Sequence, residues 1–99
     1  MEVIITETAK NRLKDIYQYY KKVASIKIAR RIKQELIQRI QSLKHYKDIG
    51  PIDEYLEYLK KGHRKLTEGN FKIVYRIQEN TIFITDIFDT RQHPGKQQE

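Results

Sequence analysis

Hydrophobic residues recur at every third or fourth position through most of the first half of the chain, which is the period of an α-helix. The first such face carries Ala9, Leu13, Ile16, Tyr17 and Tyr20. Threonines stand at the start of this segment, where a side-chain oxygen can accept hydrogen bonds from the first free N–H groups of a helix. We therefore predict a first helix over residues 7–22, preceded by a short β-branched strand over residues 2–5.

A second helix is predicted over residues 25–46. Its apolar stripe is formed by Ala29, Ile32, Leu36, Ile40 and Leu43. Ser25 suits the capping position at the start of this helix. The helix is expected to end before Gly50-Pro51, because proline disfavours helical backbone in the residue that precedes it. Two helices joined by so short a connection are expected to pack as an antiparallel hairpin.

Beyond Gly62 the period changes from helical to two, which is typical of strands. Phe71, Ile73, Tyr75 and Ile77 would lie on one side of a strand, and the alternate residues Lys72, Val74 and Arg76 on the other. Turn-forming residues occupy 68–70 and 78–80, so we predict three consecutive antiparallel strands, the last over residues 81–88. A short helix is predicted within residues 52–61.

These elements predict one α+β domain over residues 1–99, with a helical hairpin packed on a small, mainly antiparallel sheet of three or four strands. The apolar stripes of both helices need a sheet face to cover, and the side with Phe71 and Ile73 is the natural one. This packing would leave Lys72 and Arg76 on the side away from the helices. We expect that side to gather cations from distant stretches of the chain, Arg91 among them.

The net charge of +7 is concentrated in the helical half. Between Lys10 and Lys47 twelve Lys and Arg residues stand against two acidic ones, Asp15 and Glu35. Such an excess favours a polyanion or an acidic protein as the partner, although a solvated helix face is the alternative. The chain has no cysteine and no long apolar run, so we expect a soluble cytoplasmic protein without disulfides.

Over nearly its whole length, the chain resembles the RelE/ParE superfamily of bacterial toxins. The resemblance rests on residues 63–66 (HRKL), 69–77 (GNFKIVYRI), 84–88 (ITDIF) and 89–94 (DTRQHP), in this order after a helical hairpin. It implies a fold like that of small microbial ribonucleases. It also implies that the chain is the toxin of a type II toxin–antitoxin, or plasmid stabilisation, system, with a cognate antitoxin as partner.

The superfamily implies two alternative activities. RelE-like members cleave mRNA on the ribosome, so the first hypothesis is a ribosome-dependent mRNA endonuclease that binds RNA and uses no metal and no cofactor. ParE-like members poison DNA gyrase and have no recognised catalytic residues, so the second hypothesis is a gyrase inhibitor. A plain nucleic-acid-binding module is a weaker third, because no helix-turn-helix or RNP-type motif is present.

Metal-free RNA cleavage needs a base, charge stabilisation at the phosphate and an acid for the leaving oxygen. The resemblance implies that these roles fall to four candidate catalytic residues: Lys65, Lys72, Arg91 and His93. Lys72 stands where RelE-like toxins have a functional arginine, and lysine keeps the charge but loses the two-pronged fit to phosphate.

Three further residues are candidates for substrate binding: His63, Arg64 and Arg76. For four of the seven candidates there is a structural alternative. Arg64 can be one half of a structural ion pair, Lys72 and Arg76 can form a solvated strand face, and His93 can be an exposed residue of the tail. Asp86 and Asp89 have no evident third ligand, so no metal site is predicted.

Overall fold

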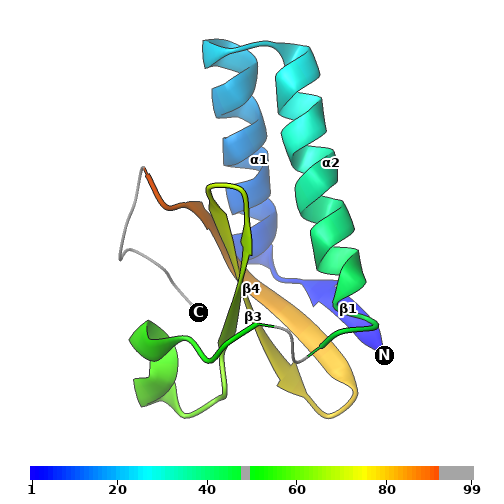
Figure 1. Ribbon diagram of the computed structural model, residues 1–99, viewed down its shortest axis with the longest axis vertical. Helices are drawn as coiled ribbons and strands as arrows, with labels where there is room; N and C mark the ends of the chain where they lie inside the picture. The colour runs from blue at the N-terminus through cyan, green and yellow to red at the C-terminus, as the bar shows by residue number, and fades with distance from the viewer. Residues whose placement is uncertain (48–49, 92–99) are drawn as a thin grey trace.

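The computed structural model describes residues 1–47 and 50–91. The elements follow one another as β1 (Glu2–Ile5), α1 (Glu7–Val23), α2 (Ile26–Ser42), the 3₁₀-helix η1 (Glu54–Leu59), β2 (Arg64–Glu68), β3 (Phe71–Gln78) and β4 (Thr81–Asp89). In Figure 1 the two long helices form a hairpin that covers one side of the sheet and extends well beyond it. The predicted α+β class is confirmed.

The helical hairpin begins as its sequence predicts. The side chain of Thr6 accepts a hydrogen bond from the backbone N–H of Ala9, and that of Ser25 accepts one from Ile28. The second helix is shorter than predicted, because it ends at Ser42. After it the N–H of Leu43 donates to the carbonyl of Ile40, a bond that closes a tighter 3₁₀ turn. The prediction to residue 46 was therefore wrong by about one helical turn.

The sheet has the strand order β1-β4-β3-β2. β1 pairs in parallel with β4, and the other two pairings are antiparallel. The connection from β1 to β4 runs through the whole helical hairpin, as a parallel pairing requires a long crossover. A register shift between Val74 and Tyr75 opposes these two residues to Asp86 and Ile84, so that Thr85 is an extra residue in β4.

The main core lies between the helices and the sheet. Its buried members are Ala9, Leu13, Leu36, Ile40, Leu43, Leu66, Phe71, Ile73, Tyr75, Ile82, Ile84 and Ile87. A smaller cluster on the other side of the sheet joins Val74 and Phe88 to Leu56 of η1. The predicted helix-facing strand side is thus confirmed, while Val74 is covered by η1 instead of being open to solvent beside Lys72. None of the described helices is long and apolar enough to cross a membrane.

Candidate functional site

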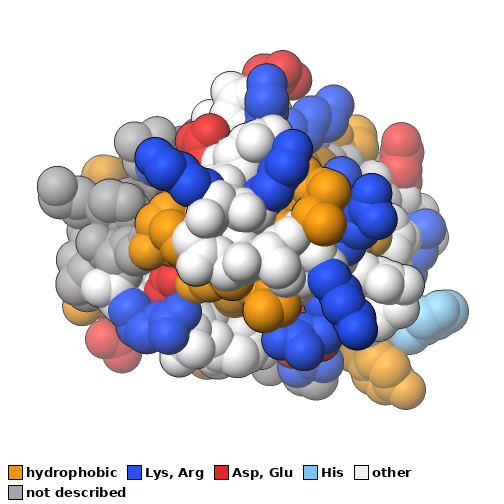
Figure 2. All heavy atoms as spheres, turned by 90° about the horizontal axis from the view of Figure 1, so that it is seen from above, with side chains coloured by type: hydrophobic (Ala, Val, Ile, Leu, Met, Phe, Trp, Pro, Cys, Tyr) orange, Lys and Arg blue, Asp and Glu red, His pale blue; other side chains and the backbone are white. Residues whose placement is uncertain are grey.

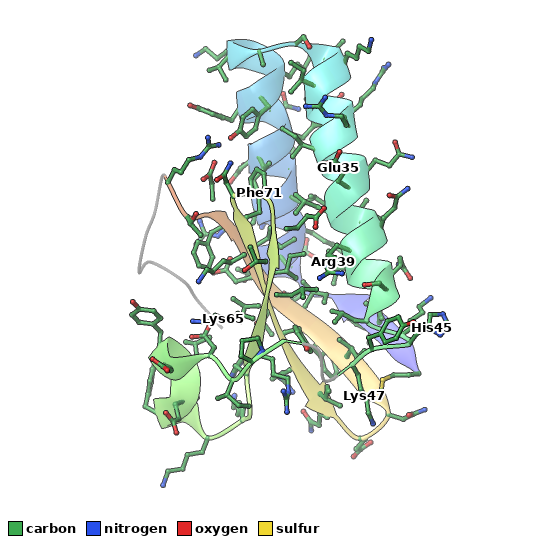
Figure 3. All side chains as sticks on the ribbon, in the orientation of Figure 1. Glu35, Arg39, His45, Lys47, Lys65 and Phe71 are labelled. Atoms are coloured by element: carbon green, nitrogen blue, oxygen red, sulfur yellow. The ribbon has the colours of Figure 1, made fainter. Side chains whose placement is uncertain are left out.

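Two of the predicted catalytic lysines share the side of the sheet that faces away from the helices. Lys65 of β2 pairs with Val74, and Lys72 of β3 pairs with Thr67 and Phe88. Residues opposite one another in paired strands point to the same side, so Lys65 and Lys72 lie on the face that carries the smaller apolar cluster. Figure 3 shows Lys65 beside η1, and its Nζ lies 5.8 Å from the centre of the Tyr55 ring.

Arg91 lies on the opposite side. It follows Asp89, whose strand partner is Phe71, and the Phe71 ring packs edge-on against Tyr20 of α1 at 6.1 Å between ring centres. An Arg91 terminal nitrogen, Nη2, donates to the Tyr20 hydroxyl at 2.7 Å and to Asp89 Oδ2 at 3.2 Å. The expectation that Lys72 and Arg91 gather on one face was therefore wrong, because the sheet separates them.

Tyr20, Asp89 and Arg91 form a closed triad of hydrogen bonds. The Tyr20 hydroxyl donates to Asp89 Oδ2 at 2.9 Å, and the backbone N–H of Arg91 donates to Asp89 Oδ1 at 2.9 Å. The Asp89 side chain is only 2% exposed, whereas that of Arg91 is 58% exposed. The triad therefore fixes the end of β4 to α1 and still leaves part of the arginine open to solvent.

The pKa values in this triad shift as the hydrogen bonds require. Burial alone would raise the pKa of Asp89, but the bonds from the Arg91 side chain, the Arg91 backbone and Tyr20 outweigh it and hold that pKa below its ordinary value. Burial, followed by the bond to Asp89, raises the pKa of Tyr20. The hydrogen bond to the Asp89 carboxylate raises the pKa of Arg91. The Asp89 carboxylate is thus ionised at neutral pH and already accepts hydrogen bonds from Arg91 and Tyr20, which does not suit a group that transfers protons.

The candidate substrate-binding residues lie near one another in the sheet, because Arg64 begins β2 and pairs with Tyr75, the neighbour of Arg76. His63 is buried with 1% exposure, directly before β2. The Nη1 of Arg64 donates to the Gly50 carbonyl at 2.8 Å, which ties β2 to the segment after α2. The guanidinium carbon of Arg76 lies 4.6 Å from the centre of the Phe83 ring. His93 lies outside the described residues. The structure therefore brings Lys65 and Lys72 onto one face and does not bring Arg91 to them.

Asp86 and Asp89, considered above as metal ligands, each have a cation instead. Arg12 of α1 forms an ion pair with the fully buried Asp86, with 3.1 Å between Nε and Oδ1. Arg91 forms an ion pair with Asp89. Sequence reasoning missed Arg12 and Tyr20 as their partners. The available signal was that two acidic residues stood in a strand whose other residues are apolar or threonine. Within residues 1–47 and 50–91 no group of three His, Asp or Glu side chains is arranged to hold a metal.

A second feature with the character of a binding site lies on the hairpin. A groove between α1 and α2 is lined by Tyr17, Arg30, Lys33, Gln34, Ile37 and Gln38. The groove continues toward Lys10 and Lys14 of α1, and the Nζ of Lys33 lies 5.5 Å from the centre of the Tyr17 ring. Its lining is partly apolar, and the charged residues of the lining are basic, which suits an acidic segment of a protein partner.

Comparisons with known proteins agree with this geometry. The sequence model of a family described as the ParE toxin of the type II toxin–antitoxin system parDE matches residues 3–94. A search of curated proteins finds no match. A solved structure described as a chromosomal ParDE toxin–antitoxin system from P. aeruginosa has a chain with the same fold, with a TM-score of 0.78 and 22% identity over 90% of this chain and 95% of that one. Because the family match spans nearly the whole sequence, this chain belongs to the ParE toxin family of type II toxin–antitoxin systems.

Proposed function

We propose that this toxin acts by binding DNA gyrase and inhibiting it, without chemistry of its own. The observation that carries the proposal is the separation of Lys72 from Arg91 by the sheet, with Arg91 held by Asp89 and Tyr20. Charge stabilisation at a reacting phosphate needs donors that converge on one point. A protein-binding poison has no such requirement, and membership of the ParE family favours the same activity.

A second candidate remains the ribosome-dependent mRNA endonuclease. It is supported by Lys65 and Lys72, which lie on one face of the sheet, and by Tyr55, which is 63% exposed and whose ring centre lies 5.8 Å from the Nζ of Lys65. Two cations on one face, one of them beside an accessible aromatic ring, are suited to a phosphate and a stacked base. In this version Lys65 and Lys72 hold the RNA, and the roles of Arg91 and His93 in catalysis remain predictions.

Membership of a toxin–antitoxin family supports a cognate antitoxin as the partner of this chain. We propose that the antitoxin contributes an acidic segment that folds on the basic helices. The groove, whose lining combines Tyr17 and Ile37 with Lys33 and Arg30, has the matching charge. Such a segment would cover part of the helical hairpin and neutralise its excess of cations.

One pair of assays separates the two activities. Purified toxin is added to DNA gyrase in a supercoiling assay, and separately to ribosomes that are translating a defined mRNA, whose cleavage is followed by primer extension. The proposal predicts inhibition of supercoiling and an intact mRNA. Cleavage at codon boundaries without any effect on gyrase would contradict it and would favour the endonuclease.

The double variant Lys65→Ala/Lys72→Ala tests the second candidate directly. If the toxin inhibits gyrase as proposed, this variant should retain toxicity in cells, because neither lysine is needed for chemistry. A matched control is Lys44→Ala/Lys60→Ala, which removes the same charge from exposed positions elsewhere. Loss of toxicity in the first double variant and not in the control, with unchanged thermal unfolding, would point to RNA cleavage.

A further inference from the structure

The connection between the two helices exposes apolar side chains. We use the name hairpin tip for residues 19–27, which join the end of α1 to the start of α2. Tyr19 is 43% exposed, Val23 56% and Ile26 42%. In Figure 1 this end of the hairpin stands clear of the sheet. In Figure 2, which looks down on it, hydrophobic side chains lie next to several Lys and Arg.

The anchoring of the helices does not require these apolar side chains at the tip. The polar contacts that tie α1 to the sheet come from Arg12, which binds Asp86, and from Tyr20, which binds Asp89. The connection itself is capped by polar groups: the N–H of Ala24 donates to the carbonyl of Tyr20, and Ser25 caps α2. Val23 and Ile26 therefore lie in water next to a connection that polar residues would serve equally well.

The charged side chains that the hairpin carries within residues 16–34 are all basic, while Asp15 and Asp89 line a hollow together with Tyr19. Residues 16–34 contain no acidic residue and six cations: Lys21, Lys22, Lys27, Arg30, Arg31 and Lys33. Lys21, Lys22 and Lys27 lie within the tip and are exposed. An apolar centre with a basic surround is complementary to an apolar centre with an acidic surround, because like charges would repel and unlike charges steer the encounter.

We propose that the hairpin tip is the surface with which the toxin docks on its protein target, at a site that is apolar in the middle and acidic around it. This inference rests on the proposed function, since it names the part of the chain that contacts the inhibited protein. A membrane surface is the less suitable occupant, because side chains that insert into lipid are typically Trp, Phe and Leu. Tyr and Arg, by contrast, are enriched where protein interfaces are most sensitive to substitution. Tyr19 lies within the tip, and Arg30 follows it in α2.

The test uses the full chain and purified DNA gyrase as the probe. Two variants alter the tip: Val23→Ser/Ile26→Ser removes the apolar centre, and Lys22→Glu/Lys27→Glu reverses two of its charges. The control Lys44→Glu/Lys60→Glu makes the same change in net charge at exposed positions away from the tip. Each tip variant should weaken binding to gyrase by about tenfold or more, as expected for residues at the centre of an interface. The control should bind like the parent chain, and all three should show its thermal unfolding temperature.

The proposal is overturned if the parent chain binds gyrase and both tip variants bind it equally well. It is also overturned if the control weakens binding as much as Lys22→Glu/Lys27→Glu, because net charge alone would then explain the effect. Binding of the chain to vesicles with anionic lipid that depends on Val23 and Ile26, with unchanged binding to gyrase, would assign the tip to a membrane instead. A parent chain that does not bind gyrase at all contradicts the proposed function itself, which is a different result.

Discussion

The two sides of the sheet differ in what covers them. The side that faces the hairpin carries a continuous core, with Ile73, Ile82 and Ile84 fully buried, and the Tyr20–Asp89–Arg91 triad at one end of it. The other side carries a small cluster around Val74 and cations that surround it. The main core and Arg91 thus lie on one side of the sheet, and Lys65 and Lys72 on the other.

This difference shows that strand alternation places side chains within a strand but not beyond its end. Within β3 the side chains alternate, so the placement of Lys72 away from the helices follows directly from that of Ile73. Arg91 lies beyond the last strand, where alternation no longer applies. Hydrogen bonds to Asp89 and Tyr20 fix its side chain instead. These bonds hold Arg91 on the helix side of the sheet, whereas the sequence alone had grouped it with Lys72.

The largest difference between the two sides is expected from the neighbouring residues Ile73 and Val74, both fully buried. Ile73→Ala should lower the free energy of unfolding by about 2–5 kcal/mol, because it leaves a cavity in the main core. Val74→Ala removes fewer atoms, and from a smaller buried cluster, and should have a clearly smaller effect. Urea denaturation of both variants measures this. A larger effect at Val74 would mean that the side away from the helices is the true core.

An intermediate effect is expected at the buried carboxylate of β4. Arg12→Met removes the partner of Asp86, whose side chain is fully buried, and should lower the free energy of unfolding by roughly 1–3 kcal/mol, since Arg12 itself is partly solvated. Arg31→Met is the control, because its pair with Glu35 is exposed on both sides and should matter by about 0.5 kcal/mol or less. Equal losses in the two variants would show that burial of Asp86 has no bearing on the pair.

The triad gives stability a dependence on pH. The pKa of Asp89 is lower in the folded chain than its ordinary value of about 4. The ionised carboxylate therefore stabilises the fold fully at pH values above its ordinary pKa. This stabilisation is lost as the pH falls through the lower pKa of the folded chain. Asp89→Asn should therefore be less stable than the parent chain at pH 7, and the gap should shrink in acid. Urea denaturation of both proteins at pH 7 and at acid pH measures this difference in the free energy of unfolding.

Tyr20→Phe is the companion variant for this measurement. It keeps the carboxylate and Arg91 and removes the hydroxyl that donates to Asp89 and accepts from Arg91, so the free energy of unfolding should fall by about 1–2 kcal/mol. A gap between Asp89→Asn and the parent chain that stays constant from neutral to acid pH would contradict the assigned role of the ionised carboxylate.

The smallest effect on folding is expected at Lys72. It is half-buried on the side away from the helices, next to Thr67 and Phe88 on the neighbouring strands, and Lys72→Ala should change the free energy of unfolding by no more than about 0.5 kcal/mol. Chemical denaturation checks this, and Lys60→Ala is the exposed control. A loss of several times that amount would mean that the stem of Lys72 is part of the small cluster.

The sequence alone determined the elements whose signals are local. Helical spacing located both helices, because residues three and four apart share a helix face wherever the helix is placed. Alternation located β3 and assigned Ile73 to the helices and Lys72 to the other side. The motifs from His63 to Pro94 indicated the superfamily, and the family match confirms this assignment.

Only the tertiary structure decided which distant residues meet. Tyr20 and Arg91 are separated by 71 positions, and Arg12 and Asp86 by 74, so no period of either segment carries information about the contact. The parallel pairing of β1 with β4 and the extra residue at Thr85 are equally non-local. From the sequence, Arg91 was expected to be available to a ligand. Its partners, the buried carboxylate of Asp89 and the hydroxyl of Tyr20, come together only when the hairpin packs on the sheet.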